Sequence, residues 1–339
     1  MTSHPIRAAA ALLALAAAQP ASSQTTAPPP VTHLRQVVDS LAQAGRFSGV
    51  VVLTRNGEPV LELAHGMADR EAGRANDVET AFNLGSLNKL FTRIAVEQLV
   101  AEGRIHHDST IAAYWPDYPN GDVSRRVTIA QLLEHRSGLG GNIFDAPPGG
   151  TRADIRHNRD FVQLFASEPL QFEPGTSRRY SNAGYVVLGE IVARVTGEDY
   201  YDYVRRSIYQ PAGMTRTGHF AVDSLPPNTA LGYTRGGRDA RDDAQLRPNR
   251  ELLPGRGSSA GGGYSTARDL LRFIAAARAG RIPAARVNGI GAAGGAPGLN
   301  AIIETDLPGG YDLVALTNLD PPSAENVGQL FREMVDATP

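Results

Sequence analysis

The stretch Gly85-Ser86-Leu87-Asn88-Lys89 contains the single lysine among the 33 lysine and arginine residues of the chain. An arginine stays protonated in nearly any site, whereas a lysine loses its proton when it is desolvated. A spacing of three residues places Ser86 and Lys89 on one face of a helix, where the amine reaches the hydroxyl. Because a serine paired with a base becomes nucleophilic, the stretch predicts a catalytic pair. Two alternatives stay open: a chance placement of the lysine, and a Ser86 that only caps a helix.

Hydrophobic patterns on both sides of this stretch predict an α+β fold. β-rich runs flank Asn56-Gly57, the strongest short signal for a β-hairpin. Apolar residues that recur every three to four positions predict helices, and the middle of the chain is mostly helical with Pro- and Gly-rich connections. The predicted strands are 48–54, 59–64, 300–304 and 311–317, and the predicted helices are 31–44, 87–101, 128–134, 159–167, 182–196, 199–208, 267–279 and 323–335.

The positions of these strands define the predicted fold class, α/β (α+β). We expect one antiparallel β-sheet built from both chain ends and flanked by helices, with a mostly helical inserted lobe beside it. The sheet lobe comprises about 31–85 and 255–339, and the helical lobe about 86–254. A binding site is expected in a cleft between the lobes. The charged, Gly-rich stretch 235–250 is interpreted as a solvated loop, with a lid over the site as the alternative.

Composition limits the function further. The net charge is −2 with both signs scattered, which argues against a nucleic-acid partner, and the lack of cysteine excludes disulfides and thiolate sites. A basic start, an apolar run over 8–18 and small residues up to 23 are typical of a signal peptide, residues 1–23. Residues 24–30 are predicted to be a disordered linker. The apolar run is too short to span a bilayer, so we expect an exported protein, periplasmic or secreted, without stable membrane insertion.

Three other motifs carry weaker signals. Tyr180-Ser181-Asn182 precedes a predicted helix and, taken alone, is an ordinary helix entry. Gly257-Ser258-Ser259-Ala260-Gly261 fits the Gly-x-Ser-x-Gly elbow of α/β-hydrolases, but Leu253-Pro254-Gly255-Arg256 stands where the required strand should be. His106-His107-Asp108 contains metal-binding residue types, but adjacent side chains diverge and nothing nearby completes a ligand set. We expect no metal ion and no cofactor.

Ser86-x-x-Lys89, followed about ninety residues later by Tyr180-x-Asn182, resembles the motifs of the serine β-lactamase and penicillin-binding protein superfamily. The resemblance is to the class C-like branch with esterases and D,D-carboxypeptidases, and it runs from about residue 49 to the C-terminus. It implies a β-lactamase/transpeptidase-like fold. The segments that carry it are SGVVVLTRNGEPVLELAHGMAD (48–69), FNLGSLNKLFT (82–92), VTIAQLLEHRSGL (127–139), FEPGTSRRYSNAGYVVLGEIV (172–192), GGGYSTARDLLRF (261–273) and VALTNLD (314–320).

The resemblance implies a role for each matching residue. Ser86 would be the nucleophile and Lys89 the proton acceptor. Tyr180 would be a phenol that shuttles the proton, and Asn182 an amide that orients the substrate. Because a phenol near an ammonium ionises more readily, we expect Lys89 and Tyr180 to share one proton and to titrate as a pair. His135 matches a landmark that looks structural, and we assign it no chemistry.

The chain departs from the family pattern at the predicted edge strand of the sheet. Where relatives carry a basic residue followed by Thr or Ser and Gly, this sequence has Ala292-Ala293-Gly294-Gly295. The missing cation at Ala292 is expected to weaken binding of β-lactams and of peptides ending in D-alanine, since it faces the substrate carboxylate in relatives. An oxyanion hole needs only backbone N–H groups, and the resemblance implies those of Ser86 and of Gly295, which follows Gly294.

We therefore interpret the chain as an exported serine hydrolase that cleaves an ester or amide through a Ser86 acyl-enzyme, with small or hydrophobic esters favoured. One alternative is a D-alanyl-D-alanine carboxypeptidase or class C-like β-lactamase that binds carboxylates through another arginine, such as Arg256 or Arg286. A second is a non-catalytic penicillin-binding-type module. The expected partner is a small-molecule ester, amide or peptide. The sequence leaves open the natural substrate, the oligomeric state and the signal cleavage site.

Overall fold

The computed structural model describes Met1 and residues 29–236 and 245–337. Beyond Met1, the predicted signal peptide lies outside the described residues, as do 24–28 of the predicted linker and 237–244 of the predicted loop. The first helix, α1, spans Pro29–Gln43, so the last two residues of the predicted disordered linker, Pro29 and Pro30, are helical instead. Proline suits the first turn of a helix because the N–H that it lacks would have no partner there.

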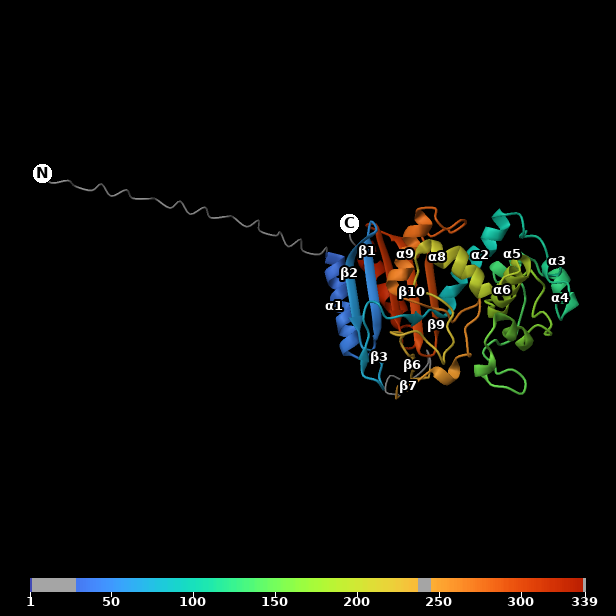
Figure 1. The fold of residues 1–339 in the computed structure, drawn as a ribbon, viewed down its shortest axis with the longest axis horizontal. Helices are drawn as coiled ribbons and strands as arrows, with labels where there is room; N and C mark the ends of the chain where they lie inside the picture. The colour runs from blue at the N-terminus through green and yellow to red at the C-terminus, as the bar shows by residue number, and fades with distance from the viewer. Residues whose placement is uncertain (2–28, 237–244, 338–339) are drawn as a thin grey trace.

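The centre of the fold is a five-stranded sheet in the order β2-β1-β11-β10-β9 (Figure 1). β1 (Gly49–Arg55) pairs antiparallel with β2 (Glu58–His65) on one side and with β11 (Tyr311–Thr317) on the other. β10 (Leu299–Leu307) follows, and β9 (Gly291–Ala296) forms the edge. The predicted antiparallel sheet built from both chain ends is therefore confirmed.

The turn between β1 and β2 shows why the hairpin could be predicted. Asn56 and Gly57 have φ values of 53° and 85°. A type I′ turn requires positive φ at both central residues, which asparagine and glycine tolerate best. The two residues therefore direct the chain back onto itself and set the pairing of the first two strands.

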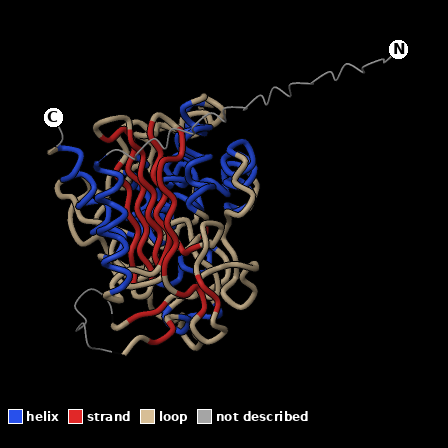
Figure 2. Tube along the Cα trace, turned by 90° about the vertical axis from the view of Figure 1, so that its left-hand side faces the viewer, coloured by secondary structure: helices blue, strands red, loops and turns tan. Residues whose placement is uncertain are grey.

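Helices cover both faces of the sheet (Figure 2). Val51 and Leu53 of β1 belong to a core shared with α1 and with α10 (Ser323–Asp336). The alternate residues Val50 and Val52 belong to the larger core, which α9 (Ala267–Arg278) and the helical lobe complete. Side chains of a strand alternate between faces, so a strand covered on both sides appears in the sequence as an unbroken apolar run.

The helices between residues 85 and 212 form a lobe beside the sheet (Figure 1). α2 (Lys89–Ala101) packs against α6 (Asn182–Thr196) and α7 (Tyr200–Val204). The predicted helix 159–167 is a 3₁₀ helix, η3 (Asn158–Leu164), and the predicted helix 199–208 is divided between α7 and a π-helical turn, η4 (Arg205–Tyr209). None of the helices in the described ranges is long and apolar enough to cross a membrane.

The remaining elements are short. They are the helices η1 (Gly85–Asn88), α3 (Ile111–Tyr114), α4 (Gly121–Arg126), α5 (Ile129–Leu133), η2 (Arg152–Asp154), α8 (Gln210–Ala212) and η5 (Arg250–Leu252), and the paired strands β3 (Met67–Asp69) with β4 (Arg74–Ala75), β5 (Phe82–Asn83) with β8 (Tyr264–Ser265), and β6 (Tyr233–Thr234) with β7 (Arg247–Pro248).

Candidate active site

Ser86 lies in η1, the 3₁₀ turn that leads directly into α2. Two segments from the C-terminal part of the chain hold this turn. The N–H of Leu84 donates to the carbonyl of Gly263 over 2.8 Å. On the β9 side, a Cβ added to Gly294 would lie 2.8 Å from the Ser86 nitrogen and 2.0 Å from the Leu84 carbonyl oxygen. The backbone at Ser86 is therefore fixed by direct contact with the edge strand, and only glycine fits at position 294.

Lys89 is the first residue of α2 and is only 7% exposed. Its Nζ donates to Ser86 Oγ at 3.1 Å, to Asn182 Oδ1 at 2.8 Å and to the Ala260 carbonyl at 2.5 Å. Burial lowers the pKa of Lys89 from 10.5 to about 7. The amine can therefore be neutral near pH 7 and accept a proton, which an arginine in its place could not do.

The phenol of Tyr180 contacts the same hydroxyl. Its Oη donates to Ser86 Oγ over 2.8 Å, and Lys89 Nζ lies 4.8 Å from the centre of its ring. Although 56% of Tyr180 is exposed, burial still raises its pKa, and the hydrogen bond to Ser86 opposes this rise. This upward direction is opposite to the easier ionisation expected beside an ammonium, and the shared titration of Lys89 and Tyr180 stays a prediction. Burial favours the neutral form of both groups, so the phenol of Tyr180 stays protonated, while the ammonium of Lys89 can give up its proton near pH 7.

The first turn of α6 places Asn182 next to Lys89. Ser181 is the N-cap of this helix, and its Oγ accepts from the Gly184 N–H at 3.1 Å. Such a cap satisfies an N–H that has no partner within the helix. Asn182 follows directly, lines the cleft and accepts the hydrogen bond from Lys89. The structure thus brings together Ser86, Lys89 and Asn182 as the sequence predicts, with Tyr180 beside them.

The ring of His135 packs against the ring of Tyr180. The two rings are stacked with centroids 4.6 Å apart, and His135 Nδ1 accepts from the Ser181 N–H at 3.2 Å. Burial, together with the positive charges of Lys89 and of two nearby arginines, lowers the pKa of His135 to about 4. The imidazole is therefore neutral at ordinary pH, as its acceptor role at Nδ1 requires.

β9 confirms that the segment with Ala292 and Gly294-Gly295 is the edge strand. Gly295 lines the cleft, and its nitrogen lies 3.1 Å from the position of a Cβ added to Gly85. The amides of Ser86 and Gly295 thus belong to two backbone segments in direct contact. Two such N–H groups can bind the oxygen of an attacked carbonyl.

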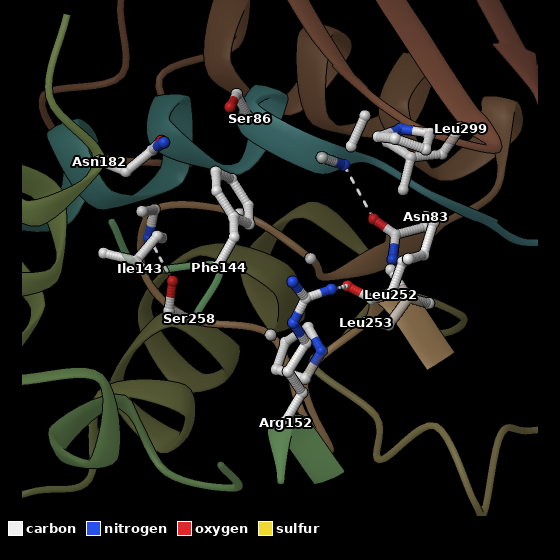
Figure 3. A pocket seen from close by; sticks show the side chains of 18 of the residues that line it. Asn83, Ser86, Ile143, Phe144, Arg152, Asn182, Leu252, Leu253, Ser258 and Leu299 are labelled. Atoms are coloured by element: carbon white, nitrogen blue, oxygen red, sulfur yellow. Dashed lines mark hydrogen bonds between the residues drawn. The ribbon is translucent and has the colours of Figure 1, made fainter. Parts of the chain in front are cut away.

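A cleft of about 490 Å³ lies beside Ser86 (Figure 3). Phe144 lines this cleft, and 51% of its surface is exposed. Among the described residues that line the cleft, Arg152 has the one charged side chain. The other walls are mostly apolar and include Ile143, Val222, Leu252, Leu253 and Leu299. This composition suits a substrate with a hydrophobic part.

The two motifs that were set aside on sequence grounds do not form separate sites. Ser258 is 2% exposed, and its Oγ accepts from the Ala260 N–H within a tight turn. No long buried strand leads into it, as an α/β-hydrolase elbow would require. His107 pairs with Glu97 at 3.2 Å. In the part of the chain that the structure describes, no three His, Cys, Asp or Glu side chains are placed to hold a metal ion.

The alternative carboxylate-binding arginines lie elsewhere. Arg256 stacks on Tyr201, 3.8 Å from the ring centre, and its Nε donates to the His219 carbonyl. Arg286 is exposed, and neither arginine lines the cleft. Sequence reasoning missed Arg152 and Phe144, because they lie in an irregular segment without periodic pattern.

The Beta-lactamase family profile matches residues 34–317. The chain is 34% identical over 278 residues to Esterase EstB of Burkholderia gladioli, covering 73% of this chain and 69% of that protein. The chain spans about half of the length, 54%, of another relative, a protein from Bacillus subtilis (strain 168).

Solved structures show the same fold. A penicillin binding protein from Bacillus halodurans superimposes with a TM-score of 0.77 at 26% identity, over 89% of this chain and 99% of that one. A D-amino acid amidase from Ochrobactrum anthropi SV3 superimposes with a TM-score of 0.74 at 23% identity, over 92% and 100%. The expected β-lactamase/transpeptidase-like fold is confirmed.

The family profile covers most of the chain, and the similar proteins include an esterase and an amidase, which are both hydrolases. The chain belongs to the beta-lactamase family, within the superfamily of serine β-lactamases and penicillin-binding proteins.

Proposed function

We propose that the protein is an exported esterase that cleaves small or hydrophobic carboxylic esters through an acyl-enzyme on Ser86. One observation carries the proposal: Lys89 Nζ and Tyr180 Oη lie 3.1 Å and 2.8 Å from the same hydroxyl oxygen, Ser86 Oγ. The mostly apolar cleft beside Ser86 and the 34% identity to an esterase support an ester as substrate.

In the acylation step, Lys89 is in its neutral form, so the hydroxyl of Ser86 now donates to Nζ. The amine accepts the hydroxyl proton while Ser86 Oγ attacks the ester carbonyl carbon. The carbonyl electron pair moves onto the oxygen, where the N–H groups of Ser86 and Gly295 stabilise the negative charge. When this oxyanion collapses, the bond to the alcohol breaks. Tyr180 donates its proton to the departing oxygen and regains one from Lys89.

Water then completes the reaction by the reverse route. It attacks the acyl carbon and gives its proton to the Lys89–Tyr180 pair, and the bond to Ser86 Oγ breaks with return of a proton to the serine. Asn182 holds Lys89 through its Oδ1, and its amide nitrogen is available at the cleft to orient the substrate.

Ala292 is the reason to favour esters over β-lactams. The family resemblance implies a cation at this position of β9, where this chain has the methyl group of Ala292, so the strand offers no charged partner to a substrate carboxylate. A carboxypeptidase or β-lactamase activity would need a cation from another part of the cleft.

A comparison of two chromogenic substrates tests the proposal. We expect the wild type to hydrolyse a short-chain p-nitrophenyl ester faster than a chromogenic cephalosporin, and Ser86→Ala to lose both activities. A fluorophosphonate should label the peptide that contains Ser86. Faster cephalosporin turnover would favour a β-lactamase, whereas absent labelling and an unchanged Ser86→Ala variant would favour a non-catalytic module.

Export rests on the N-terminal pattern of residues 1–23 and is tested separately. The full chain should be recovered outside the cytoplasm with a shortened N-terminus, and a chain without residues 1–23 should stay inside. Recovery of the unprocessed full chain in the cytoplasm would contradict export.

A further inference from the structure

Arg152 is the one charged side chain among the described residues that line the cleft. It begins η2, and its carbonyl accepts from the Gly255 N–H at 2.9 Å, which fixes its backbone against the opposite segment. Figure 3 shows the guanidinium pointing into the pocket, on the side away from Ser86 in this view. A positive charge thus lies inside a cleft whose other walls are mostly apolar.

This guanidinium uses few of its N–H donors within the described residues. It donates from Nη1 to the Leu252 carbonyl at 3.2 Å, and it forms no ion pair with any residue in the described ranges. A guanidinium has five N–H donors. The nearby Asp154 carboxylate is occupied by Thr151, whose N–H and hydroxyl both donate to it, at 2.7 Å and 2.9 Å. The neighbouring Arg156, by contrast, pairs with Asp223.

Binding of a purely apolar substrate would therefore carry a cost at this position. A ligand that fills the cleft removes water from the guanidinium, and a desolvated cation without an anionic partner is unfavourable. A carboxylate provides that partner, because it accepts two parallel N–H bonds from one arginine. Leu252, Leu253 and Phe144 meanwhile offer apolar contact to the chain between the two ends of such a ligand.

We propose that Arg152 forms an anion subsite in the cleft, so that the preferred substrates are esters with an apolar arm that ends in a carboxylate. The inference rests on the proposed function of Ser86.

Two substrate series test the subsite. In the first, the carboxylate is on the acyl arm: p-nitrophenyl hemiesters of adipic and suberic acid are compared with their terminal carboxamides. In the second, it is on the alcohol arm: the acetate ester of ω-hydroxyhexanoic acid is compared with that of its amide. Carboxylate and carboxamide have nearly the same shape, so the ratio of their kcat/KM values reports charge recognition.

In at least one series, we expect the wild type to prefer the carboxylate by about tenfold or more in kcat/KM. Arg152→Gln should abolish this ratio, and Arg152→Lys should reduce it in part, because a lysine keeps the charge but loses the paired donors. Arg250→Gln is the matched control. Arg250 is exposed, bonds the Val222 carbonyl and does not line the cleft, so its variant should keep the wild-type ratio.

The possible outcomes separate the two proposals. If the wild type cleaves all of these esters in a Ser86-dependent way but shows no carboxylate preference in either series, the subsite is wrong and the esterase function stands. A preference that survives unchanged in Arg152→Gln, or in Arg152→Lys where the first variant fails to fold, also overturns the subsite. If no ester is cleaved, or Ser86→Ala remains active, both proposals fall.

Discussion

The imidazole of His135 lies against the ring of Tyr180, with 4.6 Å between the centroids and 31° between the planes. His135 has a φ of 58°, in the left-handed region that few non-glycine residues adopt. Its Nδ1 also accepts the Ser181 N–H. His135 does not contact Ser86 Oγ, so we infer that it is a positioning residue that holds the phenol beside the hydroxyl.

Two substitutions of His135 distinguish the contribution of its ring from that of its acceptor nitrogen. His135→Phe keeps the stacked ring and loses the hydrogen bond from Ser181, whereas His135→Ala loses both. We expect kcat to fall more in His135→Ala than in His135→Phe, because Tyr180 loses its support. Ester hydrolysis, measured as kcat and KM separately, checks this. Equal activity of His135→Ala and wild type would contradict the positioning role.

His135 also predicts an acid-dependent stability. Its folded pKa of about 4 lies below the unfolded value of 6.5, so between these values the unfolded chain binds more protons. Stability from this group is complete above about pH 6.5 and is lost as the pH falls towards 4, by about 3 kcal/mol. Urea unfolding of wild type and His135→Phe across this range measures it, and parallel curves would contradict it.

Lys89→Arg should reduce kcat/KM by about 10²–10⁴-fold, because the charge stays while the capacity to accept a proton is lost. In the wild type, kcat/KM should rise with pH through about 7, as Lys89 becomes neutral. The raised pKa of Tyr180 keeps the phenol protonated in this range. A pH-rate profile with an ester substrate checks both points, and a flat profile from pH 5 to 9 would contradict the role of Lys89.

Lys89→Met should be inactive, and its stability should respond to pH differently from that of the wild type. The folded pKa of Lys89, about 7, lies below 10.5, so the wild type gains stability as the pH rises between these values. The methionine variant lacks this gain. Its free energy of unfolding relative to wild type should therefore be most favourable below pH 7 and decline towards pH 10. Urea unfolding at pH 6, 8 and 10 provides the test.

Gly294→Ala should displace η1, because the added Cβ would lie 2.0 Å from the Leu84 carbonyl and 2.8 Å from the Ser86 nitrogen. We expect a loss of about 1–3 kcal/mol in stability and a marked loss of kcat. Gly291→Ala is the matched control on the same strand, since a Cβ there meets nothing within 4 Å. Thermal unfolding and ester hydrolysis of both variants check the contrast. Similar activity in the two variants would show that β9 does not fix the serine.

The parts of the fold that could be predicted from sequence depend on short-range patterns. The turn at Asn56-Gly57 and the apolar spacing of α2 specify their structures within a few residues. The edge strand β9, with the sequence GAAGGA, has almost no strand-forming residues. Its position follows from pairing with β10, so only the family resemblance could place it.

The site likewise contains contacts that could be predicted from sequence and contacts that could not. Ser86 and Lys89 are one helical turn apart, so their contact was predictable. The contacts of Lys89 with Ala260 and of His135 with Tyr180 join segments 171 and 45 positions apart, and the pattern of neither segment encodes them. The direction of the Tyr180 pKa shift depends on burial, which three-dimensional packing alone determines.

β1 and β11 are neighbours in the sheet. Thr54 of β1 pairs with Asp312 of β11, which lies 258 positions later in the chain. During translation, the central strand pair cannot form until the ribosome has made residues 311–317 of β11. The early hairpin therefore waits with one edge unpaired, and pairing over such separations is slow. The nascent chain thus remains without the centre of its sheet until β11 has been synthesised.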